Sequence, residues 1–114
     1  SAMKIAIPVV DKQLCLHFGH CAQFALVDVD DANKEITGTT YAEPPPHEPG
    51  VLPKWLHEQQ VNVILAGGMG TRAQQLFEQN GIQVVVGCPP ASPETLVGAY
   101  LTGELQPGDN ACDH

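Results

Sequence analysis

The chain has 114 residues, the size of one ordinary domain; 43% are hydrophobic and 16% are charged. This composition excludes a disordered chain, a coiled coil and collagen, and no apolar run reaches the roughly 20 residues of a membrane-spanning helix. Five Lys and Arg against 13 Asp and Glu give a net charge of −8, so nucleic acid and anionic lipid are poor general partners. No secretory signal pattern is visible near residue 1, and we expect a cytoplasmic protein.

Three strands are predicted in the first half of the chain. Lys4–Val10 is apolar and β-branched, and its Pro8 is expected at a sheet edge or near the end of the strand. Phe24–Asp30 alternates toward its end, and Glu35–Tyr41 follows after a turn, so the three strands form a meander. The segment 11–21 between the first two strands is predicted to be a loop.

Helices and strands alternate after the proline-rich segment 44–50, which is predicted to be a loop inside one domain. Ser92 is expected to cap the last helix, with Pro93 at its first position. The predicted helices cover 51–60, 71–79 and 93–102, and the predicted strands cover 61–66 and 82–86. The order β-β-β-α-β-α-β-α indicates an α/β protein with a mixed five-stranded sheet and helices on its faces.

The predicted topology brings several loops to one edge of the sheet. Right-handed crossovers make the last three strands parallel, and the meander makes the first strand parallel to the third. The loops that leave the carboxyl ends of these strands then share the edge where open α/β sheets bind ligands. They carry residues 15–21, His47, Gly67–Gly70 and Cys88. The last helix runs away from this edge, and the tail after Gly103 is long enough to return to it.

Soft metal ligands are concentrated in two short segments, C-L-H-F-G-H-C at residues 15–21 and C-D-H at residues 112–114. Thiolate and imidazole suit zinc, copper and iron–sulfur species, and four Cys without C-x-x-C favour reduced thiols over a disulfide framework or a zinc ribbon. By themselves, the residues leave metal ligation and ordinary packing or surface roles equally open. The candidate ligands are His17, His20, Cys21, Cys112 and His114, while Cys15, His47 and Cys88 are left undecided.

A glycine-rich turn, Gly67-Gly68-Met69-Gly70, separates a predicted strand from a predicted helix. Glycines and a helix N-terminus let backbone N–H groups approach an anion, and Arg72 in the first helical turn is a candidate partner for it. A tight turn that requires Gly for its dihedral angles explains the pattern equally well. Gly67, Gly68, Met69, Gly70 and Arg72 are the candidate cofactor-binding residues; Met69 is a candidate soft ligand, although core packing is the simpler explanation for it. Neither G-x-G-x-x-G nor a Walker motif is present, so a nucleotide site has weak support.

No catalytic arrangement is recognisable in the sequence. A Ser, His and Asp set with familiar spacing is missing, and Cys15 with His17 is not a nucleophile signature by itself. The acidic residues Asp28, Asp30 and Asp31 are expected at the end of the sheet opposite the ligand-binding edge. We therefore expect a binding protein and not an enzyme.

Four stretches resemble a known family: K-I-A-I-P-V, H-F-G-H-C-x-x-F, V-x-V-I-L-A-G-G-M-G and L-T-G-E-L. They are similar to the dinitrogenase iron–molybdenum cofactor biosynthesis domain, the NifX-like carrier domain also found at the end of the NifB maturase. The resemblance covers residues 3–105, with 106–114 as a tail. It implies a ribonuclease-H-like three-layer fold that binds iron–sulfur or iron–molybdenum clusters, or their precursors, in transit. Positions that match the family motif are His17, Gly67, Gly68 and Gly70, while Cys21, Cys112 and His114 resemble additional ligands of a stand-alone subgroup.

The sequence therefore predicts a cytoplasmic carrier for an iron–sulfur or iron–molybdenum cluster, with donor and acceptor proteins as partners. Two alternatives stay open. One is a mononuclear zinc- or copper-binding protein for regulation or storage, and the other is a phosphate- or nucleotide-binding enzyme that uses the glycine turn. Stand-alone members of the family also occur where no nitrogen is fixed, so the resemblance alone does not assign a nitrogenase role.

Overall fold

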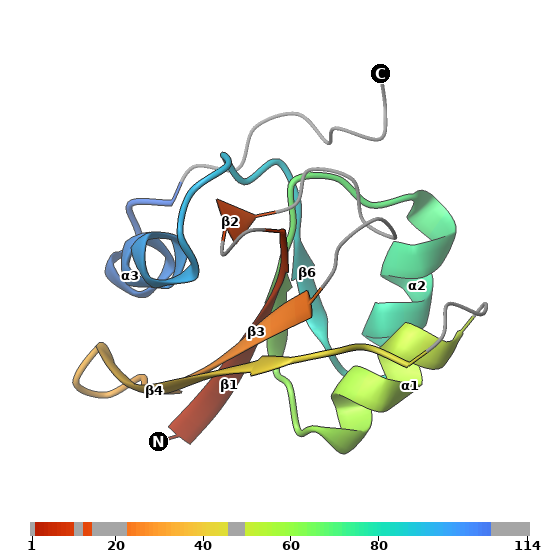
Figure 1. Ribbon diagram of the computed structural model, residues 1–114, viewed down its shortest axis with the longest axis horizontal. Helices are drawn as coiled ribbons and strands as arrows, with labels where there is room; N and C mark the ends of the chain where they lie inside the picture. Colours follow the sequence, from red (N-terminus) through yellow and green to blue (C-terminus); the bar gives the residue numbers. More distant parts are fainter. Residues whose placement is uncertain (1, 11–12, 15–22, 46–49, 106–114) are drawn as a thin grey trace.

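A single mixed sheet forms the centre of the molecule (Figure 1). The structure is a computed structural model that describes residues 2–10, 13–14, 23–45 and 50–105. The spatial order of the five main strands is β4-β3-β1-β5-β6, and the short β2 pairs with β1. The strands are β1 (Ala2–Val10), β2 (Gln13–Leu14), β3 (Gln23–Asp30), β4 (Glu35–Ala42), β5 (Val63–Leu65) and β6 (Gln83–Val85).

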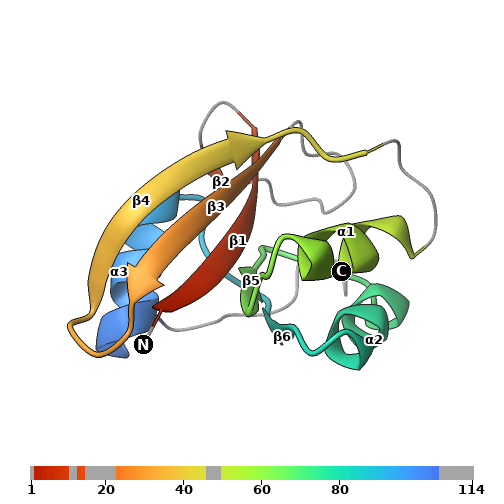
Figure 2. The ribbon, with the colours of Figure 1, turned by 90° about the horizontal axis from the view of Figure 1, so that it is seen from below.

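Helices cover both faces of the sheet, which gives three layers (Figures 1 and 2). The helices are α1 (Val51–Glu58), α2 (Thr71–Gln79) and α3 (Pro93–Thr102). α1 and α2 lie together on one face, and α3 lies on the other and runs opposite to β1 (Figure 2). No helix among the described residues is long and apolar enough to cross a membrane. The α/β class, the mixed sheet of five main strands and the three helices confirm the prediction.

The strand directions follow from the pairing registers. β3 is antiparallel to both β1 and β4, while β5 is parallel to both β1 and β6. β1, β4, β5 and β6 therefore point in the same direction. This confirms the prediction that the first, third, fourth and fifth of the predicted strands are parallel.

One expectation about the chain next to the first strand needs correction. The predicted loop over 11–21 contains the short strand β2, whose Leu14 pairs with Val9 of β1. A two-residue strand is too short to show an alternating pattern. Pro8 lies on the central strand near its end, which is one of the two positions expected for it. On the side of β1 away from β3, Pro8 falls between the residues that pair with β5 and those that pair with β2. No strand pairs with Pro8 on that side, so its missing N–H costs no hydrogen bond there.

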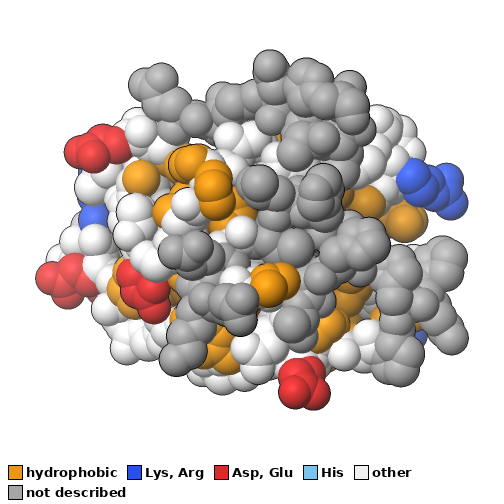
Figure 3. All heavy atoms as spheres, turned by 45° about the horizontal axis from the view of Figure 1, so that its top comes forward, with side chains coloured by type: hydrophobic (Ala, Val, Ile, Leu, Met, Phe, Trp, Pro, Cys, Tyr) orange, Lys and Arg blue, Asp and Glu red, His pale blue; other side chains and the backbone are white. Residues whose placement is uncertain are grey.

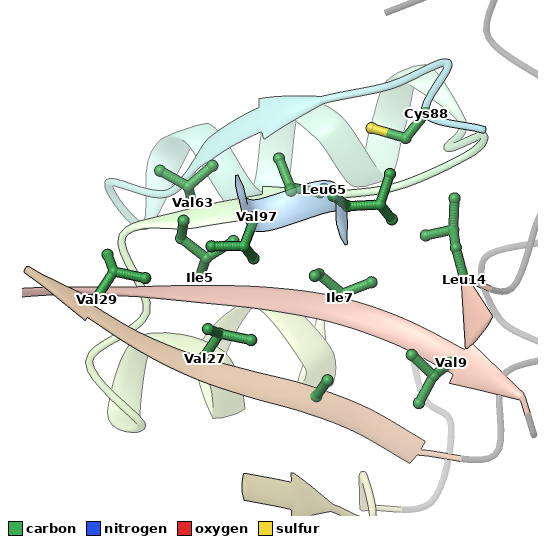
Figure 4. Close-up of a cluster of buried hydrophobic side chains, with 12 residues drawn as sticks. Ile5, Ile7, Val9, Leu14, Val27, Val29, Val63, Leu65, Cys88 and Val97 are labelled. Carbon is green, nitrogen blue, oxygen red and sulfur yellow. The ribbon is translucent and has the colours of Figure 1, made fainter. Parts of the chain in front are cut away.

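Alternation along β1 and β3 divides the buried side chains between two cores. Ile5, Ile7 and Val9 point to the face covered by α3, and Ala6 points to the face covered by α1 and α2. The α3-side core, shown in Figure 4, contains Ile5, Ile7, Val9, Leu14, Ala25, Val27, Val29, Val63, Leu65, Cys88, Leu96 and Val97. The α1/α2-side core contains Ala6, Phe24, Leu26, Leu52, Leu56, Val61, Ile64, Ala66, Met69, Phe77 and Ile82.

The helix ends follow the local signals. α2 has the predicted bounds, and Gly81 just beyond it has a φ of 76°. α3 begins as expected, because the Ser92 side chain accepts a hydrogen bond from the Thr95 N–H at 3.3 Å. α1 ends at Glu58, two residues earlier than predicted, and Gln60 adopts a left-handed φ of 67° that cannot continue a helix.

Candidate functional site

Four strands bring their following segments to one edge of the sheet, which we call the carboxyl edge. The strands end at this edge with Val10 of β1, Ala42 of β4, Leu65 of β5 and Val85 of β6. Figure 3 shows described apolar side chains between acidic groups at the left and below and a basic group at the right. The chain that follows these strands contains the Cys/His segment 15–22, His47, the glycine turn and Cys88. The segment 15–22 begins after β2, not directly after β1.

The residues on either side of the Cys/His segment pair with the same residue of β1. Val9 pairs with Leu14 of β2 on one side and with Gln23 of β3 on the other. Leu14 is only 5% exposed and packs in the α3-side core, and its N–H donates to the Ala91 carbonyl oxygen at 3.0 Å. The residue that precedes Cys15 is therefore held by a strand pair, a buried side chain and a hydrogen bond to the β6–α3 connection.

The glycine turn is tied to the connection that follows β6. Gly67 accepts a hydrogen bond from the Gly87 N–H at 3.0 Å, and Ala66 accepts one from the Cys88 N–H at 3.1 Å. Gly67 and Gly68 are buried, whereas Gly70 is exposed. The side chain of Met69 is fully buried in the α1/α2-side core. Its sulfur is therefore a core group and not an exposed ligand.

The N-terminus of α2 is electrostatically suited to an anion. Its N-cap is Gly70, which provides no side-chain hydrogen bond, and no acidic residue lies in the first turn. Arg72 is exposed in that same turn, where its positive charge adds to the positive end of the helix dipole. A cation at a helix N-terminus is unfavourable by itself, so an anion bound beside Arg72 would stabilise both the side chain and the helix end.

Cys88 is a core residue. Its side chain is 3% exposed, and Figure 4 shows it at the end of the α3-side core where Leu14 also lies, with its sulfur directed toward the other members. Burial raises the pKa of the Cys88 thiol to about 11, against a smaller opposing effect of a hydrogen bond with the Ala66 backbone. A protonated thiol is a poor metal ligand and nucleophile, so this geometry favours packing for Cys88.

The predicted metal ligands His17, His20, Cys21, Cys112 and His114 lie outside the described residues, as do Cys15 and His47. Within the described ranges, no group of three or more His, Cys, Asp or Glu side chains could hold a metal ion. Of the residues proposed to bind the ligand, the structure brings the glycine turn and Arg72 to the carboxyl edge.

The remaining polar candidates lie at the opposite end of the sheet or on its helices. Asp30 pairs with Ala2 at the start of β1, and hydrogen bonds from Asn33, chiefly from its side chain, lower the pKa of Asp30. Asp28 lies 3.8 Å from the Lys4 ammonium. His57 is exposed, as expected for a solvated residue, but its Nδ1 also lies 3.0 Å from the Asn80 carbonyl oxygen and links α1 to the end of α2.

Sequence reasoning missed the tie between Leu14 and Ala91. One signal was available, because Leu14 is an apolar residue directly before the Cys/His segment in a stretch predicted to be a loop. A buried apolar side chain at the start of a loop indicates an anchor.

Comparison with known families finds one match that spans nearly the whole chain. Residues 2–103 match the family model described as dinitrogenase iron–molybdenum cofactor. An uncharacterized protein of Methanocaldococcus jannaschii, MJ0580, is 32% identical over 108 residues, which cover 91% of this chain and 90% of that protein. The match supports the resemblance read from the sequence motifs.

Solved structures share the fold. The crystal structure of PH0822 has a TM-score of 0.87 at 27% identity and covers 98% of this chain and 100% of its own. The apo form of the orange protein from Desulfovibrio gigas has a TM-score of 0.71 at 24% identity, over 95% of this chain and 94% of its own. The second likeness is evidence for the fold alone.

Proposed function

Because the chain belongs to the dinitrogenase iron–molybdenum cofactor family, we propose that it binds an iron–sulfur or iron–molybdenum cluster, or a precursor of one. The cluster is cargo, taken from a donor protein and passed to an acceptor protein. The chain's own contribution is binding and release, and it catalyses no reaction. Family membership supports a connection with the iron–molybdenum cofactor, and the carrier role is the finer part of the proposal.

The observation that carries the proposal is the double attachment of the Cys/His segment at Val9. Its flanking residues Leu14 and Gln23 pair on either side of this central-strand residue. Adjacent strands lie about 4.8 Å apart, so the two ends of the segment are held roughly 10 Å from each other. The residues that flank this segment are thereby held at the carboxyl edge, next to the connection that carries Ala91.

The charge of the cargo fits the other side of the site. A cluster with thiolate ligands is anionic, while the chain itself carries a net charge of −8. Local positive features must therefore offset the charge of the cluster. The uncapped N-terminus of α2 and Arg72 supply such features, together with the glycine turn, whose backbone can approach an anion closely.

Release is the second requirement of a carrier. In the proposal, ligands come from the segment 15–22 and from Cys112 and His114 of the tail. Two separate segments can part without breaking the sheet, because the strand pairs on both sides of Val9 do not involve the tail. A four-ligand cage closed within one segment would release its metal less readily.

The experiment is anaerobic reconstitution of the full chain with iron and sulfide, followed by absorption spectra and by measurement of bound iron and acid-labile sulfide. We expect cluster bands in the wild type and their loss or marked change in His17→Ala, Cys21→Ala and Cys112→Ala. Cys88→Ala is the matched control, because it removes a buried thiol whose raised pKa keeps it protonated. It should bind the same amount of iron as the wild type.

Three results would contradict the carrier proposal. Identical spectra for the wild type and the Cys21→Ala and Cys112→Ala variants would remove those thiols from the site. One zinc or copper ion per chain without acid-labile sulfide would favour the mononuclear alternative. A ligand at about 100 times its dissociation constant adds about 2.7 kcal/mol of stability, so a thermal shift with nucleotides and none with molybdate would favour the nucleotide-binding alternative.

A further inference from the structure

The C-terminal end of α2 is followed by the only Asn-Gly pair of the sequence, Asn80-Gly81. An asparagine amide before glycine is chemically reactive, because glycine has no side chain to keep its backbone nitrogen away from the amide carbon. The reaction between these two groups is spontaneous deamidation. The local structure around Asn80 therefore determines whether the folded chain undergoes it.

The backbone around this pair forms a closed helix cap. The Gly81 N–H donates to the Glu78 carbonyl oxygen at 3.0 Å. The Ile82 N–H donates to the Phe77 carbonyl oxygen, also at 3.0 Å. These two bonds form a Schellman motif, and Gly81 supplies the left-handed φ of 76° that the motif requires. Ile82 and Phe77 are buried in the α1/α2-side core, so side chains close the cap as well.

The two reacting groups are held away from each other. The Nδ2 of Asn80 donates to the Leu76 carbonyl oxygen at 2.8 Å, which directs the side-chain amide back along the helix. The ψ of Asn80 is 11°, so the Gly81 nitrogen lies near the backbone nitrogen of Asn80 and not beside its Cβ. A ring between Asn80 and Gly81 can therefore close only after their shared peptide rotates. That rotation breaks the bond from the Gly81 N–H to Glu78.

A side chain of the neighbouring helix holds the same peptide. His57 of α1 donates from its Nδ1 to the Asn80 carbonyl oxygen at 3.0 Å. The ring nitrogen carries the proton in this contact, because a carbonyl oxygen can only accept. The carbonyl group belongs to the peptide that has to rotate. His57 therefore opposes the movement that ring closure requires.

We propose that Asn80 is a latent deamidation site, protected by the cap of α2 and by His57, and that it reacts when the last turn of α2 opens. In the reaction the Gly81 nitrogen attacks Cγ of Asn80. A C–N bond forms, the Cγ–Nδ2 bond breaks, and ammonia leaves with the proton of the Gly81 N–H. Water then opens the cyclic imide at either carbonyl and gives aspartate or isoaspartate. One water enters for each ammonia lost, and nothing is oxidised or reduced.

Either product weakens the cap permanently. A carboxylate lacks the N–H that the Leu76 carbonyl oxygen accepts, and its negative charge adds to the negative end of the α2 dipole. The last turn of α2 contains no basic residue to offset that charge. Isoaspartate also lengthens the backbone within the cap. α2 begins at the carboxyl edge and ends away from it, so this inference does not depend on the proposed cluster binding.

The test compares deamidation of the full chain when it is folded in mildly alkaline buffer and when it is unfolded in guanidinium chloride at the same pH. Peptide mass spectrometry measures aspartate and isoaspartate at position 80. The folded chain should react at least about tenfold more slowly. His57→Ala should accelerate the reaction of the folded chain about fivefold, which is the effect of one hydrogen bond. Glu58→Ala is the matched control, because it truncates the adjacent exposed side chain of α1 and should leave the rate unchanged.

Leu96→Ala separates opening of the cap from unfolding of the whole chain. Leu96 is buried in the α3-side core, so its truncation lowers global stability without a change at the cap. Its rate should stay near that of the wild type. Three outcomes would overturn the inference: equal rates in the folded and unfolded chains, no modification of Asn80 in either, or equal acceleration by Leu96→Ala and His57→Ala.

Discussion

The backbone N–H of Leu14 donates to the carbonyl oxygen of Ala91 at 3.0 Å, across 77 residues of sequence. This bond joins the strand that precedes the Cys/His segment to the connection that leads into α3. The Leu14 side chain strengthens the tie, because it is buried in the α3-side core. Leu14 therefore determines where the proposed metal-binding segment begins.

We predict that Leu14→Ala destabilises the protein and also changes cluster binding. Loss of a buried leucine side chain costs about 2–4 kcal/mol of unfolding free energy, which urea titration followed by the fluorescence of Trp55 would measure. Displacement of the segment should also lower the iron content and shift the absorption bands after reconstitution.

Leu96→Ala is the control for this prediction. Leu96 is 1% exposed in the same core but lies on α3, away from the Cys/His segment. It should lower stability by a similar amount and leave the absorption bands unchanged. If both variants changed the bands equally, Leu14 would have no specific positioning role.

The Cys88 thiol should make stability depend on pH in the alkaline range. Its pKa is about 11 in the folded protein against 9.0 for an ordinary thiol. Between these values the unfolded chain loses the proton while the folded chain keeps it, so the free energy of unfolding falls as pH rises. The expected loss is about 2 kcal/mol by pH 11. Urea titrations between pH 8 and pH 11 would measure it, and Cys88→Ala should show a smaller decrease than the wild type.

Arg72→Gln should have opposite effects on the cluster-free and cluster-bound proteins. Removal of a cation from the N-terminus of α2 should raise the unfolding free energy of the cluster-free protein by about 0.3 kcal/mol. Cluster affinity should fall, because the anion loses its positive partner. Lys34→Gln removes the same charge from the turn between β3 and β4 and should leave affinity unchanged. Equal losses of affinity in both variants would indicate a general charge effect instead.

Ser92→Ala should lower the unfolding free energy by about 1 kcal/mol, because the Ser92 side chain accepts a hydrogen bond from the Thr95 N–H at the start of α3. Thermal or urea unfolding would measure the change. Ser92→Asp keeps an acceptor at the cap and adds a favourable charge at the helix N-terminus, so it should retain or exceed wild-type stability. A destabilised Ser92→Asp variant would contradict the capping role.

Local signals were sufficient to predict most of the fold. α3 begins at Pro93 after the Ser92 cap, and α2 ends at the Asn80-Gly81 pair, because both boundaries depend on residues adjacent in sequence. β2 could not be predicted in this way. Its two residues pair through contacts with Val9 and Ala91, and the second of these is distant in sequence.

The candidate site was predictable to a smaller extent. The common direction of β1, β4, β5 and β6 follows from element order, so sequence reasoning could assign the glycine turn and Arg72 to one edge of the sheet. Whether Cys112 and His114 meet His17, His20 and Cys21 depends on the path of the tail, which no local pattern determines. That convergence stays a prediction, to be tested by the Cys112→Ala reconstitution.

The central place of β1 has a consequence for how the chain assembles. Ile5 and Ala6 pair with Val63 and Ile64, 58 residues later, and side chains of β1 contribute to both cores. During synthesis, neither of the two cores can therefore be completed until the middle of the chain has been made. Non-local pairing of this kind slows folding, and deletion of β1 would abolish the entire fold where loss of an outer strand would only fray it.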